Sequence, residues 1–219
     1  MLWVVDDFYP NPDEIRAKAL ELDYNLGRSA RGVNHPGERA LTYRKDQRAN
    51  EYWIRNRAYL RNRWRTICNS LPIAWESMNS NCAFNLCDKS KEARFSWVHS
   101  DDSQADPRIR MYAAVIYLTP NPPPCSGTIM FEYKGNPRDE QVERREKNKH
   151  YPVIRGNYYL DPTSAHPDWT PHVTVENRYN RCIIYEADML HAPQDAGFGN
   201  SKETARLTQL GFWHGERRD

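Results

Sequence analysis

After Leu71 the chain changes from helical to strand-like patterning, and this change most constrains what it can fold into. The second part consists of short β-branched and aromatic segments separated by Pro, Gly, Asn and Asp: 81–87, 94–99, 111–119, 127–133, 153–160, 172–176, 180–187 and 204–213. Such segments, divided by turn residues at regular intervals, are typical of a β-sandwich or barrel. The stretch 120–126 (PNPPPCS) is too rich in proline for a central strand and is predicted to be a loop.

Near the N-terminus the sequence predicts a short strand followed by a helix. An apolar, strand-like run extends from Leu2 to Val5. Asn11 and Pro12 then predict an N-cap and the first position of a helix that ends near Leu22. Acidic residues directly after Pro12 support this start, because they complement the positive end of the helix dipole.

A second, longer helix is predicted over 48–71, because its apolar side chains recur at helical spacing along one stripe. The stripe consists of Trp53, Leu60, Trp64, Ile67 and Leu71, and the opposite face carries Arg55, Arg57, Arg61, Arg63 and Arg65. A solvated outer face is the expected role of these arginines. Residues 25–46 are predicted to be an irregular basic loop, and 138–149 a charged surface insertion.

Together these patterns predict an α+β fold in which N-terminal helices buttress a mostly antiparallel β core. The helical part is expected at about 1–75 and the β core at about 80–214. No repeat or linker divides the chain, so a single domain over 1–219 is expected.

Composition excludes several classes of protein. Lys and Arg number 31 against 29 Asp and Glu, and this near balance argues against a nucleic-acid-coating protein or a polybasic membrane binder. No apolar run approaches the ~20 residues that span a bilayer, and the N-terminus lacks the basic start of a signal peptide. Five cysteines without CxxC pairs favour reduced thiols, and hence a cytoplasmic protein.

Candidate chemistry centres on three residues. His99 and Asp101 follow a strand pattern, and residues two apart in an extended chain point to the same side. His191 follows the apolar strand 180–187, and sheet topology could bring it to the pair. Two histidines and one carboxylate, with the remaining positions open, are the arrangement that holds non-haem Fe(II) for oxygen chemistry.

Two other interpretations of the pair stay open at this point. The H-x-D pattern is common, and in isolation a structural or helix-capping role is the more frequent explanation of it. Asp102 follows directly, so a shift of one residue in register would exchange the two carboxylates, although the two-residue spacing favours Asp101.

Four segments in a fixed order give the chain a resemblance to a known family: 97–102 (WVHSDD), 112–133, 180–193 (NRCIIYEADMLHAP) and 204–213 (TARLTQLGFW). Over 95–213 the chain resembles the iron(II)- and 2-oxoglutarate-dependent dioxygenases, in the branch similar to prolyl 4-hydroxylases. The opening 4–20 is similar to the N-terminal segment of an uncharacterised bacterial and phage subgroup. The resemblance implies a double-stranded β-helix, or jelly roll, as the core.

The same resemblance implies roles for individual residues. The implied iron ligands are His99, Asp101 and His191, and Fe(II), 2-oxoglutarate and O2 are the implied cofactor and cosubstrates. Arg206 would bind the distal carboxylate of 2-oxoglutarate, which suits the planar fork of a guanidinium. Thr208, on the same strand face, and Tyr117 would add contacts to that carboxylate.

The function implied is hydroxylation of an unactivated C–H group of an amino acid, a peptidyl side chain or another small polar substrate. The segments 25–46, 102–110 and 134–172 are expected to line the entrance, and the charge balance disfavours nucleic acid. The alternative is a catalytically inactive jelly-roll module that binds a metal or a partner. A cupin-like enzyme fits less well, since its usual ligands are three histidines with a glutamate.

Overall fold

The computed structural model describes residues 1–24, 37–40, 42, 51–69, 73–77, 82–89, 100–101, 109–133, 169–195 and 197–217. Several expected features lie outside these residues. They are the strands over 94–99 and 153–160, the charged segment 138–149, His99 and Asp102.

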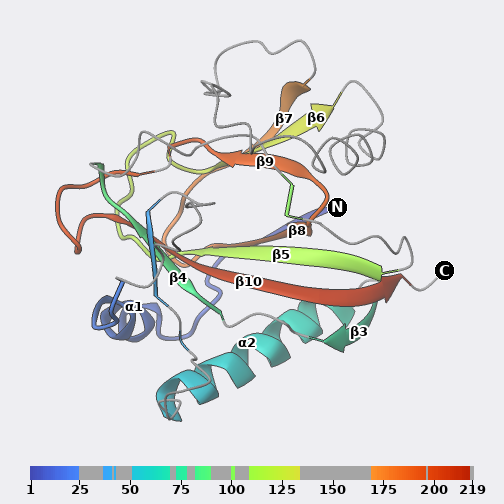
Figure 1. Cartoon of the computed structure of the whole chain (residues 1–219), viewed down its shortest axis with the longest axis horizontal. Coiled ribbons are helices and arrows are strands. Elements are labelled where there is room, and N and C mark those ends of the chain that lie inside the picture. Colours follow the sequence, from blue (N-terminus) through green and yellow to red (C-terminus); the bar gives the residue numbers. More distant parts are fainter. Residues whose placement is uncertain are drawn as a thin grey trace, which may run out of the picture.

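Two antiparallel sheets form the body of the described protein (Figure 1). The large sheet has the order β1 (Leu2–Val5), β8 (Cys182–Glu186), β5 (Ile109–Tyr117), β10 (Arg206–Arg217), β4 (Phe84–Cys87) and β2 (Glu38–Ala40), and β3 (Ile73–Ser77) also pairs with β10. The small sheet has the order β7 (Trp169–Val175), β6 (Thr128–Tyr133) and β9 (Leu190–Pro193). The expectation of a mostly antiparallel β core is therefore confirmed.

One face of the large sheet packs against the two described helices, α1 (Pro12–Leu20) and α2 (Glu51–Asn69). Trp53, Leu60 and Trp64 of the predicted stripe are buried on this face, and Ile67 packs against it, whereas Leu71 lies outside the described residues. The Trp64 ring stacks on Trp213 of β10 at 5.0 Å between centroids. Gly211 makes this contact possible, because a Cβ there would lie 2.0 Å from Cη2 of Trp64. The helices thus cover one side of the sheet, as Figure 1 shows for α2 beneath β5 and β10.

The other face of the large sheet packs against the small sheet. Tyr117, Ile183 and Tyr185 of the large sheet share a buried cluster with Met130 and Val175 of the small sheet. Alternate strand residues point to opposite faces, so this inner face carries a separate set of side chains from the helix-covered face. Residues between the two sheets therefore decide what the interior can bind.

Three strands were not expected from the sequence. β2 lies within 25–46, which was predicted to be irregular, and that prediction is wrong for Glu38–Ala40. β3 and β9 were also missed. Such short strands carry little sequence signal of their own, because pairing with β4, β10 and β6 stabilises them.

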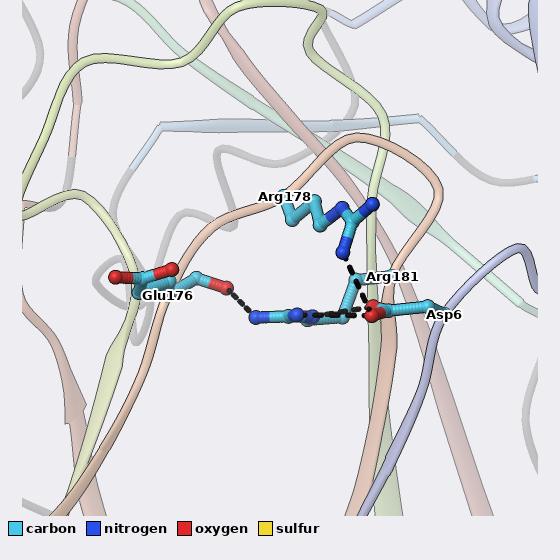
Figure 2. Close-up of polar contacts among 4 residues, drawn as sticks. All are labelled: Asp6, Glu176, Arg178 and Arg181. Atoms are coloured by element: carbon cyan, nitrogen blue, oxygen red, sulfur yellow. Dashed lines mark hydrogen bonds and ion pairs between the residues drawn. The ribbon is translucent and has the colours of Figure 1, made fainter.

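Polar contacts fasten the N-terminal segment to the turn before β8. Asp6 accepts hydrogen bonds from Nε and Nη2 of Arg181 at 2.6 and 3.1 Å, and from Arg178 at 3.1 Å (Figure 2). Arg181 also donates to the carbonyl oxygen of Glu176 at 3.2 Å (Figure 2). The arginines hold the pKa of Asp6 below its usual value, with the Arg181 hydrogen bond as the largest cause.

In the described part of the chain, neither helix is both long enough and apolar enough to cross a bilayer. Among the described residues, Cys82, Cys87, Cys125 and Cys182 form no disulfide.

Candidate functional site

Asp101 and His191 lie side by side between the sheets. Nε2 of His191 is 3.5 Å from Oδ2 of Asp101, and the histidine is 5% exposed. The Tyr185 hydroxyl contacts both residues, at 3.3 Å from Oδ2 of Asp101 and 3.1 Å from Nε2 of His191. Two of the three side chains that the sequence predicted for a metal site are thus brought together.

The backbone of the β8–β9 connection sets this geometry. The amide of Asp101 donates to the carbonyl of Ala187 at 2.7 Å, so the Asp101 segment is fastened to the turn that follows β8. Nδ1 of His191 lies 2.9 Å from the carbonyl oxygen of Met189, the residue two positions before it. Because a carbonyl only accepts, Nδ1 carries the proton, and Nε2 keeps the lone pair that a metal ligand needs.

The third expected ligand, His99, lies outside the described residues. Within the residues that are described, no group of three or more potential metal-binding side chains occurs. The described part of the expected metal site is therefore the Asp101–His191 pair with the Tyr185 hydroxyl that contacts both residues.

Arg206, Thr208 and Tyr117 meet on the same inner face. Thr208 and Tyr117 are direct partners across β10 and β5, and Arg206 lies two residues before Thr208 on the same side of β10. The Arg206 guanidinium carbon is 5.8 Å from the centre of the Tyr117 ring. The three residues that were predicted to bind one carboxylate are thus adjacent.

These residues are buried, yet part of their polar surface is unsatisfied. Arg206 is 5% exposed and Thr208 1% exposed, and neither Nε of Arg206 nor Oγ1 of Thr208 has a hydrogen-bond partner among the described residues. An unsatisfied buried polar group costs about 1–3 kcal/mol. Such groups on an inner face indicate a place for a polar ligand.

Both site tyrosines keep their protons. Burial raises the pKa of Tyr185 well above its usual value, and the nearby charge of Asp101 adds to this effect. Burial likewise raises the pKa of Tyr117, whose hydroxyl pairs with Oγ1 of Thr128 at 2.7 Å. Each hydroxyl can therefore act as a hydrogen-bond donor at neutral pH.

Sequence reasoning missed three residues of this face: Tyr185, Asn85 and Arg39. Asn85 is the only amide in the apolar strand Phe84–Cys87, so its burial is a signal that the sequence did contain. Arg39 carried no such signal, because it lies in a segment that was predicted to be irregular. Its position depends on the pairing of β2 with β4.

Three solved structures illustrate the fold that this chain shares. HygX from Streptomyces hygroscopicus, with nickel and 2-oxoglutarate bound, has a TM-score of 0.55 at 14% identity, covering 98% of this chain and 82% of its own. A prolyl hydroxylase from Trichoplax adhaerens, in complex with a hypoxia inducible factor peptide fragment, has a TM-score of 0.54 at 13% identity over 98% and 83% of the two chains. A Pseudomonas putida prolyl-4-hydroxylase has a TM-score of 0.50 at 17% identity over 100% and 93%.

At these identities the likeness shows a shared fold. No curated protein sequence matches the chain. One family model matches residues 1–213, nearly the whole chain, and its family is described as one of unknown function. The chain therefore belongs to the family of unknown function DUF6445.

Proposed function

We propose that this protein is an Fe(II)- and 2-oxoglutarate-dependent oxygenase with a jelly-roll core, which hydroxylates a C–H group of an amino acid, a peptidyl side chain or another small polar substrate. The observation that carries the proposal is that the Asp101–His191 pair and the unsatisfied Arg206–Thr208 pair lie on facing surfaces of one interior. The fold shared with prolyl hydroxylases supports it.

The donor set fits a divalent iron. One carboxylate oxygen and one imidazole Nε2 that carries no proton lie close enough to bind the same ion. We propose His99 as the third ligand, because the H-x-D spacing directs it to the same side as Asp101. Bound iron with 2-oxoglutarate would supply the oxidising power for C–H hydroxylation, which no side chain of the protein can supply.

The second half of the site fits the distal carboxylate of 2-oxoglutarate. Arg206 offers a buried positive charge that lacks an acidic partner among the described residues, and Thr208 offers a buried hydroxyl. A carboxylate there would satisfy both groups, since a guanidinium binds two carboxylate oxygens at once. We propose Tyr117 as a neighbour that shapes this end of the site, because its ring lies against Arg206.

The protein's own part in the reaction is placement. Met189 holds His191 in one tautomer through its carbonyl, and Tyr185 donates to the aspartate or the histidine from a fixed ring. The apolar side chains between the sheets exclude water from the reacting atoms. Substrate would be held beside this centre so that one C–H group faces it.

Two coarser features of the proposal follow from the chain as a whole. We propose that residues 1–219 form one domain, since strands from residue 2 to residue 217 share one sheet. We also propose that the protein works in the reducing cytoplasm, since its described cysteines form no disulfide and Fe(II) is maintained in such a compartment.

The proposal is tested with purified protein, Fe(II) and 2-oxoglutarate without oxygen. A weak visible charge-transfer band is expected, and admission of O2 should release succinate. His191→Ala and His99→Ala should each abolish the band, whereas His172→Ala, which changes an exposed histidine of β7, should leave it intact. A missing band together with no succinate would sink the proposal and favour a module that lacks turnover.

Arg206→Met separates the two halves of the site. The iron should still bind, but the KM for 2-oxoglutarate should rise at least tenfold, because a buried charge-assisted contact is lost. Iron binding is followed directly by calorimetry. An unchanged KM would remove Arg206 from the 2-oxoglutarate site without affecting the proposed metal ligands.

A further inference from the structure

A row of polar side chains crosses the inner face of the large sheet. Arg39 of β2 pairs with Asn85 of β4, and Asn85 in turn pairs with Thr208 of β10. Direct partners in antiparallel strands point to the same side, so Arg39 and Asn85 share the face that carries Thr208. The next residue, Ala40, belongs to the cluster on the helix-covered face, as this alternation requires.

Both residues have polar atoms without a partner in the described part of the chain. Nε of Arg39 and Oδ1 of Asn85 are buried and make no hydrogen bond, and Asn85 is 4% exposed. The guanidinium can only donate hydrogen bonds and the amide oxygen can only accept them. Nε of Arg39 therefore needs an acceptor, and Oδ1 of Asn85 needs a donor. The 2-oxoglutarate contacts proposed above use neither of them.

Arg39 lies on β2, the edge strand of the large sheet next to β4. Burial lowers its pKa, and the negative charge of Asp101 raises it, so the two side chains are within electrostatic reach of each other. β4 separates β2 from β10, which places the backbones of Arg39 and Thr208 roughly 10 Å apart. With Arg206 assigned to 2-oxoglutarate, the Arg39 guanidinium remains to bind a second anionic group on the same inner face.

We propose that Arg39 and Asn85 form a substrate subsite that binds the carboxylate and the neighbouring N–H group of a free amino acid. The guanidinium would bind the carboxylate, and Oδ1 of Asn85 would accept from the amino group. The subsite rests on the proposed function, which defines the position of the reacting carbon. It restricts the proposed substrates to molecules with a free carboxylate. A residue inside a peptide lacks that group.

The test uses two probes with protein that holds Zn(II) and 2-oxoglutarate, so that no turnover occurs. One probe is a mixture of the twenty protein L-amino acids, and the other is the matched mixture of their carboxamides. Ligand-observed NMR should detect binding from the acids and not from the carboxamides. Absence of a signal from the acids, or equal signals from both mixtures, would overturn the subsite.

Variants assign the binding to Arg39. Arg39→Met should lower the affinity for the detected amino acid at least tenfold. Arg39→Lys keeps the positive charge but not the planar guanidinium, so it should retain part of that affinity. Arg61→Met, which changes an exposed arginine of α2, is the matched control and should bind normally. Equal affinity in wild type and both Arg39 variants would refute the assignment, and their melting temperatures show whether they are folded.

Failure of the oxygenase proposal remains distinguishable from failure of the subsite. The acids are also titrated into metal-free Arg206→Met protein, in which the proposed 2-oxoglutarate anchor is absent. Binding there that Arg39→Met removes would support the subsite even if no charge-transfer band forms. A normal band with no amino acid binding would leave the oxygenase proposal in place and reject free amino acids as its substrates.

Discussion

Tyr185 shows how a single hydroxyl can organise a site. It is 2% exposed and contacts both Asp101 and His191, and its raised pKa keeps the proton on the oxygen. The hydroxyl can donate to only one acceptor at a time, so it couples the positions of the two side chains. In metal sites, such outer contacts orient the ligands and contribute to affinity.

Tyr185→Phe removes this hydroxyl while keeping the buried ring. Affinity for Fe(II) should fall about tenfold, because Asp101 and His191 lose a shared orienting contact. Anaerobic metal titration measures the change, and the melting temperature without metal should shift little. Tyr117→Phe is the matched control, since it removes a buried hydroxyl beside Arg206 and should leave metal affinity unaltered. Equal metal affinity in all three proteins would contradict an orienting role for Tyr185.

At the scale of elements, β10 contributes side chains to both packed faces of the large sheet. Its Arg206 and Thr208 face the small sheet, whereas Trp213 packs against α2 on the other face. The helix approaches the strand so closely that Gly211 lies directly under the Trp64 ring. The apolar stripe of α2 predicted that Trp64 would be buried, but it did not predict that the Trp64 ring would pack against Gly211.

Gly211→Ala places a methyl group where the Trp64 ring now lies. The free energy of unfolding should fall by about 1–3 kcal/mol, the usual cost of overpacking a core. Urea denaturation measures this change. In a Trp64→Phe background the added cost should shrink, because the atoms that clash are absent; strictly additive effects in this double-mutant cycle would show that the contact is not responsible.

At the scale of the whole molecule, the first and the last described strands, β1 and β10, belong to one sheet, with β8 and β5 between them. β1 pairs with β8, and β10 pairs with β3, β4 and β5, so residues far apart in sequence hold each other in register. Asp6, directly after β1, adds a bidentate ion pair with Arg181. The N-terminal segment is thus an integral part of the fold.

The Asp6 ion pair should make stability depend on pH. Because the folded pKa of Asp6 is lowered below 3.8, its contribution is present above the unfolded value and is lost as pH falls through the folded value. Asp6→Asn should cost no more than about 1 kcal/mol at pH 7, since the carboxylate is partly exposed. Urea denaturation at pH 7 and at pH 3 measures whether the difference from wild type shrinks in acid.

Asp7→Asn is the neighbouring control for this experiment. Asp7 is exposed and has a φ of 50°, a conformation that asparagine adopts readily. The free energy of unfolding of the Asp7→Asn protein should match that of the wild type at both pH values. A pH-independent loss in Asp6→Asn would mean that the charge of Asp6 is not what stabilises the junction.

The sequence by itself determined the features that depend on local periodicity. Strand alternation predicted that Arg206 and Thr208 share a face, and the apolar stripe predicted the buried side of α2. These two predictions succeed because side-chain direction repeats every two residues in a strand and about every 3.6 in a helix. The order of the motifs also named Asp101 and His191 for one site; they lie 3.5 Å apart, and their role as metal ligands stays a prediction.

Only the tertiary structure decided which residues from distant segments stand together. Tyr185 reaches Asp101 because the β8–β9 turn hydrogen-bonds the Asp101 backbone, and Arg39 faces the interior because β2 pairs with β4. Strand pairing and register arise from hydrogen bonds between segments far apart in the chain, for which short strands such as β2 carry almost no local signal. The residues that narrow the proposed substrate are therefore the ones that sequence patterns could not place.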